Sequence, residues 1–432
     1  MPLRLDTADG DFEDRFVALL AMKRESAPDV DAAVRDIIAD VITRGDEALI
    51  ELTGKFDRLD LTPETLRVDD DEVERAFREA DPGIIEALQL AHDRIRAYHE
   101  RQRPEDARYT DGIGAELGHR WTAVESVGLY VPGGLASYPS SVLMNAVPAR
   151  VAGVPRIVMT VPSPAGELNP LVLAAARIAR VSEIYRVGGA QAIAALAYGT
   201  ATIRPVAKIV GPGNAYVAAA KRQVFGVVGI DSIAGPSEVL VIADRDNDPE
   251  WLAADLLAQA EHDIAAQSIL MTDDAAFAEA VCTAVDRQLR ELPRGNIAGE
   301  SWSTFGAVIK LRSLDEAPPL ADRIAAEHLE IATRDPDALA QRIRNAGAIF
   351  LGALTPEVIG DYVAGSNHVL PTARSARFSS GLGVLDFMKR TSILRLDAAA
   401  LEQLSPAAMI LASAEGLEAH RRSVEIRRSR TS

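Results

Sequence analysis

The sequence contains very little cysteine and no long apolar run. Cys282 is the single cysteine in 432 residues, so an internal disulfide and a structural zinc–thiolate cluster are both excluded. No apolar stretch reaches about 18 residues without a charge or a proline, so the sequence predicts no membrane-spanning helix. A basic segment followed by an apolar one is missing from the start, MPLRLDTADGDFEDRF, so we expect no signal peptide. Together these absences indicate a cytoplasmic protein.

Basic residues are too few for a nucleic-acid partner. Lys and Arg number 46 against 63 Asp and Glu, for a net charge of −17. A phosphate backbone requires a basic face, so nucleic acid is excluded as the main partner. Apolar residues make up 48% of the chain, which is enough for a substantial core. At roughly 150 residues per domain, the length predicts two to four domains, and we expect an enzyme that acts on small molecules.

The periodicity of the chain changes near residue 125. Before it, apolar residues recur at helical spacing over 16–22, 30–41 and 84–98. After it, short apolar strands alternate with helices, which is typical of parallel βαβ units in a doubly wound sheet. The expected strands are 128–134, 156–162, 184–189, 207–213, 237–244, 267–272, 304–310 and 347–351, and a last helix is expected over 398–421. The second half of this series indicates a second α/β domain.

Several of these strands end in glycines, namely in VPGG (131–134), VGGAQ (187–191) and GPGN (211–214). Open α/β sheets bind ligands outside the carboxyl ends of their strands, and glycine there lets the backbone approach a ligand closely. Any one of these segments alone is typical of an ordinary turn. Each is followed by a polar side chain, Ser137, Gln191 or Asn214, so the three together favour a ligand crevice. The chain has no GxGxxG, so the dinucleotide-binding fingerprint is missing.

A second cluster of polar residues can bind a metal ion. In LLAQAEHD (256–263), Gln259 and His262 are three residues apart and share one face of a helix. Alone, a Q-x-x-H is more typical of a cap or a core arrangement. Asp361 with His368 in a loop-like stretch, and His420 near the end of the last helix, supply further nitrogen and oxygen donors. Such a set without sulfur suits Zn²⁺ or another borderline divalent ion, in an open site that can add substrate ligands.

The third pattern is AAEHLEI (325–331), in which Glu327 and His328 are adjacent. In a strand their side chains would point to opposite faces, whereas in a bend both would reach one cavity. A carboxylate beside an imidazole is suited to proton transfer near neutral pH. A surface glutamate followed by a core histidine explains the pair equally well. Cys282 lies among small apolar residues, which disfavours a covalent thiohemiacetal mechanism.

These segments, taken in order, resemble the histidinol dehydrogenase family. The resemblance includes VGGAQAIAALAYGT (187–200), IDSIAGPSEVLVIAD (230–244), GDYVAGSNHVLPT (360–372) and AEGLEAH (414–420), and it extends from about residue 10 to residue 425. It implies a zinc-dependent enzyme that oxidises L-histidinol to L-histidine through L-histidinal while reducing two NAD⁺. It also implies a homodimer in which the last helix reaches the zinc site of the other subunit.

The resemblance assigns a role to particular residues of this chain. It implies that Glu327 and His328 are catalytic. The implied zinc ligands are Gln259, His262, Asp361 and His420; the implied substrate-binding residues are these four with Ser237, His328, His368 and Glu415; the implied NAD-binding residues are Tyr130, Gln191 and Asn214. Glu415 and His420 would act across the dimer.

The expected fold is two Rossmann-like doubly wound domains with helical segments at both ends. We expect a helical segment over 1–24, an α/β domain with the zinc and catalytic residues over 25–129 plus 237–381, an NAD-side domain over 130–236, and C-terminal helices over 382–432.

Two other functions remain open. A related zinc and NAD enzyme would oxidise another small alcohol, such as a sulfonated diol. Glu415 and His368 suit a cationic amino-imidazole, whereas a sulfonate would require an arginine or an amide. A non-catalytic zinc-dependent binding protein is the other alternative, against which the intact Glu327 and His328 argue.

Overall fold

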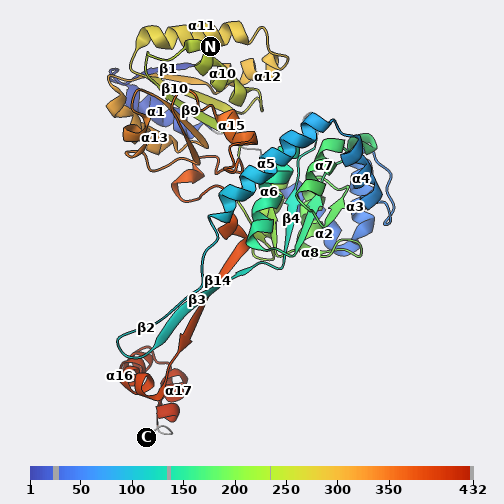
Figure 1. Ribbon diagram of the computed structural model, residues 1–432, viewed down its shortest axis with the longest axis vertical. Coiled ribbons are helices and arrows are strands. Elements are labelled where there is room, and N and C mark those ends of the chain that lie inside the picture. The colour runs from blue at the N-terminus through green and yellow to red at the C-terminus, as the bar shows by residue number, and fades with distance from the viewer. Residues whose placement is uncertain (23–28, 134–137, 234, 429–432) are drawn as a thin grey trace.

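The computed structural model describes residues 1–22, 29–133, 138–233 and 235–428. They form two α/β units and a long antiparallel ladder that leads to a separate pair of C-terminal helices (Figure 1). Both large sheets are parallel, so the expected α/β class with parallel sheets and flanking helices is confirmed.

The first unit is a six-stranded sheet of order β1-β11-β10-β9-β12-β13. Its strands are β1 (Leu3–Asp6), β9 (Glu238–Ala243), β10 (Gln267–Thr272), β11 (Ala307–Lys310), β12 (His328–Ala332) and β13 (Ala348–Leu351). Successive residues of β9 face opposite cores, because Leu240 packs with α1 (Phe12–Ala21) and α13 (Ala317–Ile324), whereas Val239 packs with three helices on the other face. Those helices are α10 (Pro249–Ala260), α11 (Ala275–Gln288) and α12 (Gly295–Thr304). Two short helices, α14 (Pro336–Ala340) and α15 (Glu357–Tyr362), complete this unit.

The second unit is a five-stranded sheet of order β6-β5-β4-β7-β8. Its strands are β4 (Ser126–Tyr130), β5 (Arg156–Thr160), β6 (Glu183–Tyr185), β7 (Lys208–Val210) and β8 (Gly229–Ile230). One face is covered by α4 (Asp70–Glu79), α5 (Pro82–Glu100), α6 (Pro139–Ala152) and α7 (Pro170–Ile178). The other is covered by α2 (Asp29–Arg44), α3 (Asp46–Asp57), α8 (Gly189–Tyr198) and α9 (Ala215–Val224).

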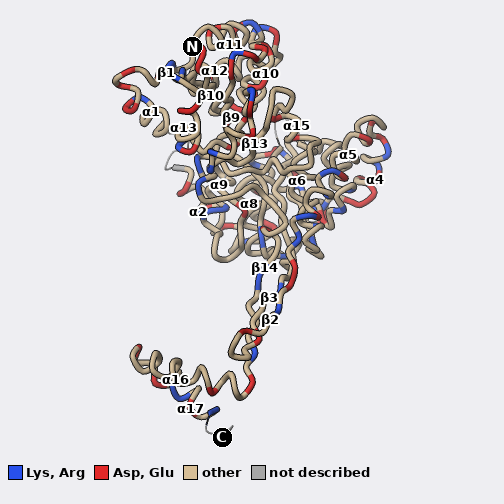
Figure 2. Tube along the Cα trace, turned by 60° about the vertical axis from the view of Figure 1, so that its left-hand side comes forward, with Lys and Arg blue, Asp and Glu red and all other residues tan. Residues whose placement is uncertain are grey.

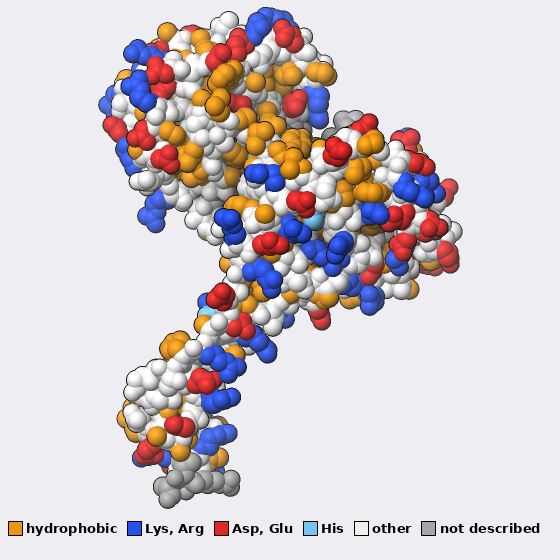
Figure 3. Space-filling view, viewed as in Figure 1, with side chains coloured by type: hydrophobic (Ala, Val, Ile, Leu, Met, Phe, Trp, Pro, Cys, Tyr) orange, Lys and Arg blue, Asp and Glu red, His pale blue; other side chains and the backbone are white. Residues whose placement is uncertain are grey.

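The third part is an antiparallel ladder of order β14-β3-β2, formed by β14 (Met388–Arg395), β3 (Glu116–Ala123) and β2 (Ala107–Thr110). It extends away from both units and ends at α16 (Ala398–Ala414) and α17 (Glu418–Arg428), which we call the C-terminal arm (Figures 1 and 2). In the space-filling view this ladder is a narrow neck (Figure 3). Charged residues of both signs lie along it (Figure 2).

The structure differs from the expected segments in several places. The first 24 residues include strand β1, and the segment after 382 includes strand β14, so neither is purely helical. The single helix expected over 398–421 is divided at Gly416, whose φ of 72° is left-handed. Residues 29–100 pack against the five-stranded sheet, whereas we expected them with the six-stranded one. Helical periodicity shows that one face is buried but not which sheet covers it.

Candidate active site

Glu327 and His328 lie at the amino end of β12, and the backbone of one neighbouring residue binds both side chains. Glu238 begins β9, the strand beside β12. Its backbone N–H donates to Glu327 Oε2 at 3.0 Å, and its carbonyl oxygen lies 3.1 Å from His328 Nδ1. Glu327 is 5% exposed and His328 4% exposed. Glu327 precedes the strand, so the two side chains need not point to opposite faces, and Glu327 Oε2 lies 3.9 Å from His328 Nδ1.

Two further carboxylates from α15 face the same imidazole. Glu357 Oε2 lies 3.6 Å from His328 Nδ1, and Asp361 Oδ1 lies 3.6 Å from His328 Nε2. The carboxyl group of Glu330 accepts the backbone N–H of Glu357 at 2.6 Å and so fixes the start of α15 to β12. Asp361 therefore lies on a short helix and not in the loop that we expected. Asp361 is four residues after Glu357, about one helical turn, which places both on one face.

Burial controls the protonation of this cluster. It raises the pKa of Glu327 to about 7 and that of Glu357 to about 8, although the adjacent His328 opposes both shifts. Burial would lower the pKa of His328, but the nearby carboxylates outweigh it and hold that pKa well above its ordinary value. A carboxyl group that titrates near neutral pH beside an imidazole can accept and return protons during catalysis.

The residues expected to bind zinc come from the end of α10 and from α15. Gln259 is buried near the end of α10, and His262 follows the helix with its N–H donating to the Gln259 carbonyl at 3.2 Å. His262 is exposed to solvent, yet the surrounding protein is dense enough to lower the pKa of its imidazole. The charge of Asp361 acts on the pKa of His262 in the opposite direction, and the helices α10 and α15 are in contact.

The chemistry of this donor set fits a zinc ion. The set offers an imidazole nitrogen from His262, a carboxylate oxygen from Asp361 and the amide oxygen of Gln259, and within the described ranges the Nε2 atom of that amide has no hydrogen-bond partner to fix its orientation. The same part of the chain contains no group of three His, Cys, Asp or Glu side chains that could hold a metal ion. Gln259 is not one of these residue types, and the single chain does not bring His420 to the site, so His262 and Asp361 alone fall short of such a group.

His368 connects the two units beside this cluster. Its Nδ1 lies 3.0 Å from the Asp361 carbonyl oxygen, and its Nε2 lies 3.3 Å from the Ser141 hydroxyl of α6. The residue before it makes a second contact between the units, since the Asn367 amide donates to the Met144 carbonyl of α6 at 2.7 Å. The expected substrate residue Ser237 directly precedes β9 and thus adjoins Glu238. The site therefore lies where the six-stranded unit meets α6 of the five-stranded unit.

The glycine-rich ends of the five-stranded sheet contact one another. The Tyr130 hydroxyl accepts the N–H of Gly189 at 3.1 Å, at the start of α8. A Cβ atom on Gly211 would lie 2.2 Å from the Tyr130 carbonyl oxygen, so only glycine fits there. Tyr130 and Gln191 are both buried, and burial raises the pKa of Tyr130 to about 12. These turns therefore form one packed edge that leaves backbone, and not large side chains, at its surface.

The remaining sequence-predicted residues have different positions. Asn214 is exposed and caps α9, because its Oδ1 accepts the N–H groups of Tyr216 and Val217. Ser137 lies outside the described residues. Glu415 and His420 belong to the C-terminal arm and are exposed, at the opposite end of the molecule from α15 (Figure 1). A single chain therefore does not bring these two residues to the other candidates.

Sequence reasoning missed Glu238 and Glu357. Glu238 acts through its backbone, which no residue pattern indicates. Glu357 had a usable signal, because its spacing of four residues from Asp361 places both on one face of a helix.

Comparison with known proteins agrees with this geometry. None of the helices among the described residues is long and apolar enough to cross a membrane. Residues 20–428 match the family described as histidinol dehydrogenase. The chain is 67% identical to "Histidinol dehydrogenase" of Mesorhizobium japonicum and 68% identical to that of Agrobacterium fabrum, over 99% of both chains in each case. A crystal structure of histidinol dehydrogenase from Elizabethkingia anophelis has a TM-score of 0.94 and 35% identity, over 99% of this chain and 98% of that one. The chain therefore belongs to the histidinol dehydrogenase family and is an oxidoreductase.

Proposed function

We propose that this protein oxidises L-histidinol to L-histidine through L-histidinal and reduces two NAD⁺ in the process, as the last step of histidine biosynthesis. The observation that carries the proposal is the buried Glu327–His328 pair, whose side chains are both bound by the backbone of Glu238. The pair lies where the six-stranded unit meets α6, which follows the glycine-rich end of β4. Family membership supports the substrate, and a cytoplasmic location is the corresponding prediction.

Zinc would be held by Gln259, His262 and Asp361, with His420 of the partner subunit as the fourth ligand. When bound, it supplies a Lewis-acidic centre that fixes the imidazole and amino nitrogens of the substrate. The nitrogen and oxygen donors of these side chains and the contact between α10 and α15 support this set. Ser237, His368 and the partner's Glu415 would complete the substrate pocket.

His328 is the proposed base for both oxidations. Because the nearby carboxylates hold the pKa of His328 well above its ordinary value, the ring must first give up its proton; the neutral imidazole then takes the hydroxyl proton of the alcohol while a hydride passes to NAD⁺, which gives the aldehyde. Water then adds to the aldehyde and forms a gem-diol. His328 then releases its proton to water, and in the second oxidation the gem-diol loses a hydride to another NAD⁺ and a hydroxyl proton to the neutral His328, which gives the acid. Carboxylates on both sides of the ring stabilise the imidazolium after each transfer.

Glu327 is the proposed base that activates the water. Because burial raises its pKa to about 7, its carboxylate is a stronger base than an exposed one. The Glu238 N–H holds one of its oxygens, so the other is available to a water molecule. Cys282 is buried in the helix α11, and burial raises the pKa of its thiol, which argues against a covalent thiol mechanism.

The five-stranded unit is the proposed NAD side. Its strand order places the crossover between β4 and β7, and nucleotides bind at such a point beyond the carboxyl ends of the strands. Tyr130 and Gly211 lie at these two strand ends, with Gln191 and Asn214 on the following helices. Glycine is required at Gly211, where a Cβ atom would lie 2.2 Å from the Tyr130 carbonyl oxygen, so the ends of β4 and β7 pack closely together at this edge.

The C-terminal arm supports a homodimer. None of the described residues of α17 is buried, and Ile410, Leu411 and Ile426 are each at least half exposed. Exposed apolar side chains of this kind mark an interaction surface. Apolar side chains also gather where the two units meet (Figure 3). We propose that the arm of each subunit packs on the other, which would bring Glu415 and His420 to the partner's site.

The test is NADH formation by the purified protein with L-histidinol and NAD⁺. Two NADH per histidinol are expected, and prolonged chelation should abolish turnover until zinc is restored, with the far-UV circular dichroism nearly unchanged. A sulfonated diol is the control substrate. Turnover of the diol in place of histidinol would support the related alcohol dehydrogenase, and no NADH with either substrate would support a binding protein.

A further inference from the structure

One buried ion pair of the five-stranded unit is not explained by the site described so far. Lys221 on α9 pairs with Asp231, the residue after β8, and their side chains are 2% and 4% exposed. Two charges withdrawn from water in this way are costly, and an apolar pair of similar volume is often as stable. Stability of the fold is therefore a weak reason for this pair.

The pair binds both polar groups of one glycine. The Lys221 ammonium donates to the Gly211 carbonyl at 2.9 Å, and Asp231 Oδ2 accepts the Gly211 N–H at 2.8 Å. Gly211 has a φ of 113°, and its other side is against the Tyr130 carbonyl oxygen. It follows directly on β7 and begins the turn from 211 to 214 that ends at the cap of α9. Its conformation is thus fixed on every side, and the ion pair supplies the polar contacts.

The same pair also connects the two units along the chain. Asp231 stands at the start of the link from β8 to β9, and β9 begins with Glu238, whose backbone binds Glu327 and His328. Further along this link, the N–H of Gly235 donates to the Thr372 hydroxyl at 2.6 Å. The link is therefore tied at one end to the Gly211 turn and, near the other, to the loop that follows His368.

We propose that Lys221 and Asp231 are positioning residues for the dinucleotide: they hold the 211–214 turn in the shape that receives NAD⁺ and set its position relative to Glu238. The inference rests on the proposed function, because it takes the edge of the five-stranded sheet with the glycine turns as the NAD side. Neither side chain needs to contact the cofactor, since both act through the backbone of Gly211. Loss of the pair should therefore weaken NAD⁺ binding more than it weakens histidinol binding.

The experiment measures NAD⁺ binding directly, by calorimetry on the full-length zinc-loaded protein. Lys221→Met keeps the length of the side chain but removes the charge and the donor to Gly211. We expect the Kd for NAD⁺ to rise by at least about tenfold, with the Kd for histidinol changed by less than about twofold. In steady-state assays the KM for NAD⁺ should rise more than kcat falls.

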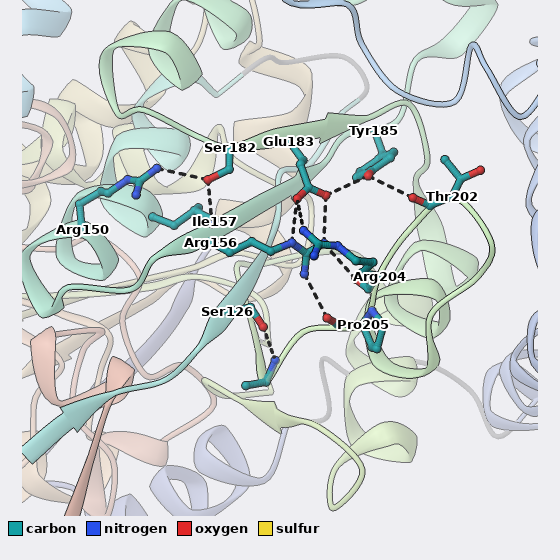
Figure 4. Close-up of polar contacts among 11 residues, drawn as sticks. Ser126, Arg150, Arg156, Ile157, Ser182, Glu183, Tyr185, Thr202, Arg204 and Pro205 are labelled. Carbon is teal, nitrogen blue, oxygen red and sulfur yellow. Dashed lines mark hydrogen bonds and ion pairs between the residues drawn. The ribbon is translucent and has the colours of Figure 1, made fainter.

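The matched control is Arg156→Met, which breaks a mostly buried ion pair with Glu183 at the opposite edge of the same sheet (Figure 4). It should lower the melting temperature while the Kd for NAD⁺ stays within about twofold of the wild type. If Lys221→Met does not fold, Lys221→Met with Asp231→Asn leaves no single buried charge and keeps an acceptor for the Gly211 N–H, so the same tenfold criterion applies to it.

The outcomes are separable. Unchanged NAD⁺ affinity in the Lys221 variant, with only a lower melting temperature, shows a purely structural pair and overturns the inference alone. Equal weakening of NAD⁺ binding by Arg156→Met also overturns it, because loss of stability would then explain both. A wild-type protein that does not bind NAD⁺ overturns the proposed function and the inference with it.

Discussion

The two parallel sheets share a strand order but differ in the edge that faces the candidate site. Counted in sequence order, β4 to β8 and β9 to β13 are both arranged 3-2-1-4-5, with β1 added beside β11 in the larger sheet. In the five-stranded sheet the glycine turns lie at the carboxyl ends of the strands. In the six-stranded sheet Glu238 and His328 lie at the amino ends of β9 and β12. The short link from β8 to β9 joins these two unlike edges.

The two edges also differ in the side chains that lie there. The edge with the glycine turns offers backbone groups and the start of α9, which Asn214 caps. The charged network of this sheet lies at the other edge, where Arg156 and Arg204 bind Glu183 (Figure 4). The facing edge of the six-stranded sheet contributes buried ionisable groups. The usual rule for ligands at carboxyl ends thus applies to one sheet alone. The comparison assigns cofactor binding to the first edge and proton transfer to the second, and the following experiments test that division.

The largest effect is expected from His328→Asn. Asparagine keeps a polar side chain near the Glu238 carbonyl but cannot take a proton, so kcat should fall by about 10²- to 10⁴-fold. NAD⁺ affinity should remain at the wild-type value, because the five-stranded sheet is untouched. Single-turnover NADH formation and calorimetric NAD⁺ titration provide the two measurements. A comparable loss of NAD⁺ affinity would break the division between the sheets.

Glu327→Gln separates the two oxidation steps at the edge of the six-stranded sheet that contains Glu327 and His328. Glutamine can still accept the Glu238 N–H but cannot activate water, so histidinal oxidation should slow by about 10²-fold or more. Histidinol oxidation to histidinal should be less affected, because it consumes no water. Supplying each substrate separately and following NADH gives both rates. Equal losses in the two half-reactions would remove Glu327 from the hydration step.

A partial recovery of activity, a smaller effect, tests whether the C-terminal arm of one subunit completes the site of the other. His420→Ala and Glu327→Gln subunits, neither of which should form L-histidine at an appreciable rate alone, are co-expressed with different tags and isolated as heterodimers, and histidine formation is measured. If His420 acts across the dimer, one site has both wild-type residues and the other has both defects, so about half of the wild-type activity should return. If His420 served its own subunit, every site would carry one defect and no activity would be recovered.

Much of the fold could be predicted from the sequence because the βαβ alternation from β4 onward is a local pattern. Most of the expected strands in that region have counterparts, for example β5, β9 and β10. The ladder strands escaped this approach, since β14 reads MKRTSILR and is mostly exposed along its length. Such a strand has neither an apolar run nor a buried face to reveal it.

Only part of the candidate site could be predicted from the sequence. Adjacent residues such as Glu327 and His328 could be proposed from their chemistry, and the structure brings them together with Asp361. The sequence could not show that they lie at amino ends of strands, because strand direction does not reveal which edge faces another unit. It also could not show the Lys221–Asp231 contact with Gly211, which depends on residues from three separate elements.

Arg156→Met should have the smallest effect on activity, because it alters the edge of the five-stranded sheet that is remote from the glycine turns. Arg156 donates two hydrogen bonds to Glu183, at 2.7 and 2.9 Å, so its loss should cost about 2 kcal/mol of stability at neutral pH. Turnover and NAD⁺ affinity should be unchanged. A change in either would mean that both edges of this sheet influence the cofactor.

The pH dependence of that stability loss gives the last test. The hydrogen bond from Arg156 is the main reason that the pKa of Glu183 is lowered from 4.5 to about 2 in the folded protein. A lowered folded-state pKa stabilises the protein fully above pH 4.5, and this contribution disappears as the pH falls toward 2. The wild type should therefore melt above Arg156→Met at pH 7, and the difference in melting temperature should shrink at about pH 3. An equal difference at both pH values would show that lost packing of the arginine stem, and not its charge, stabilises this edge.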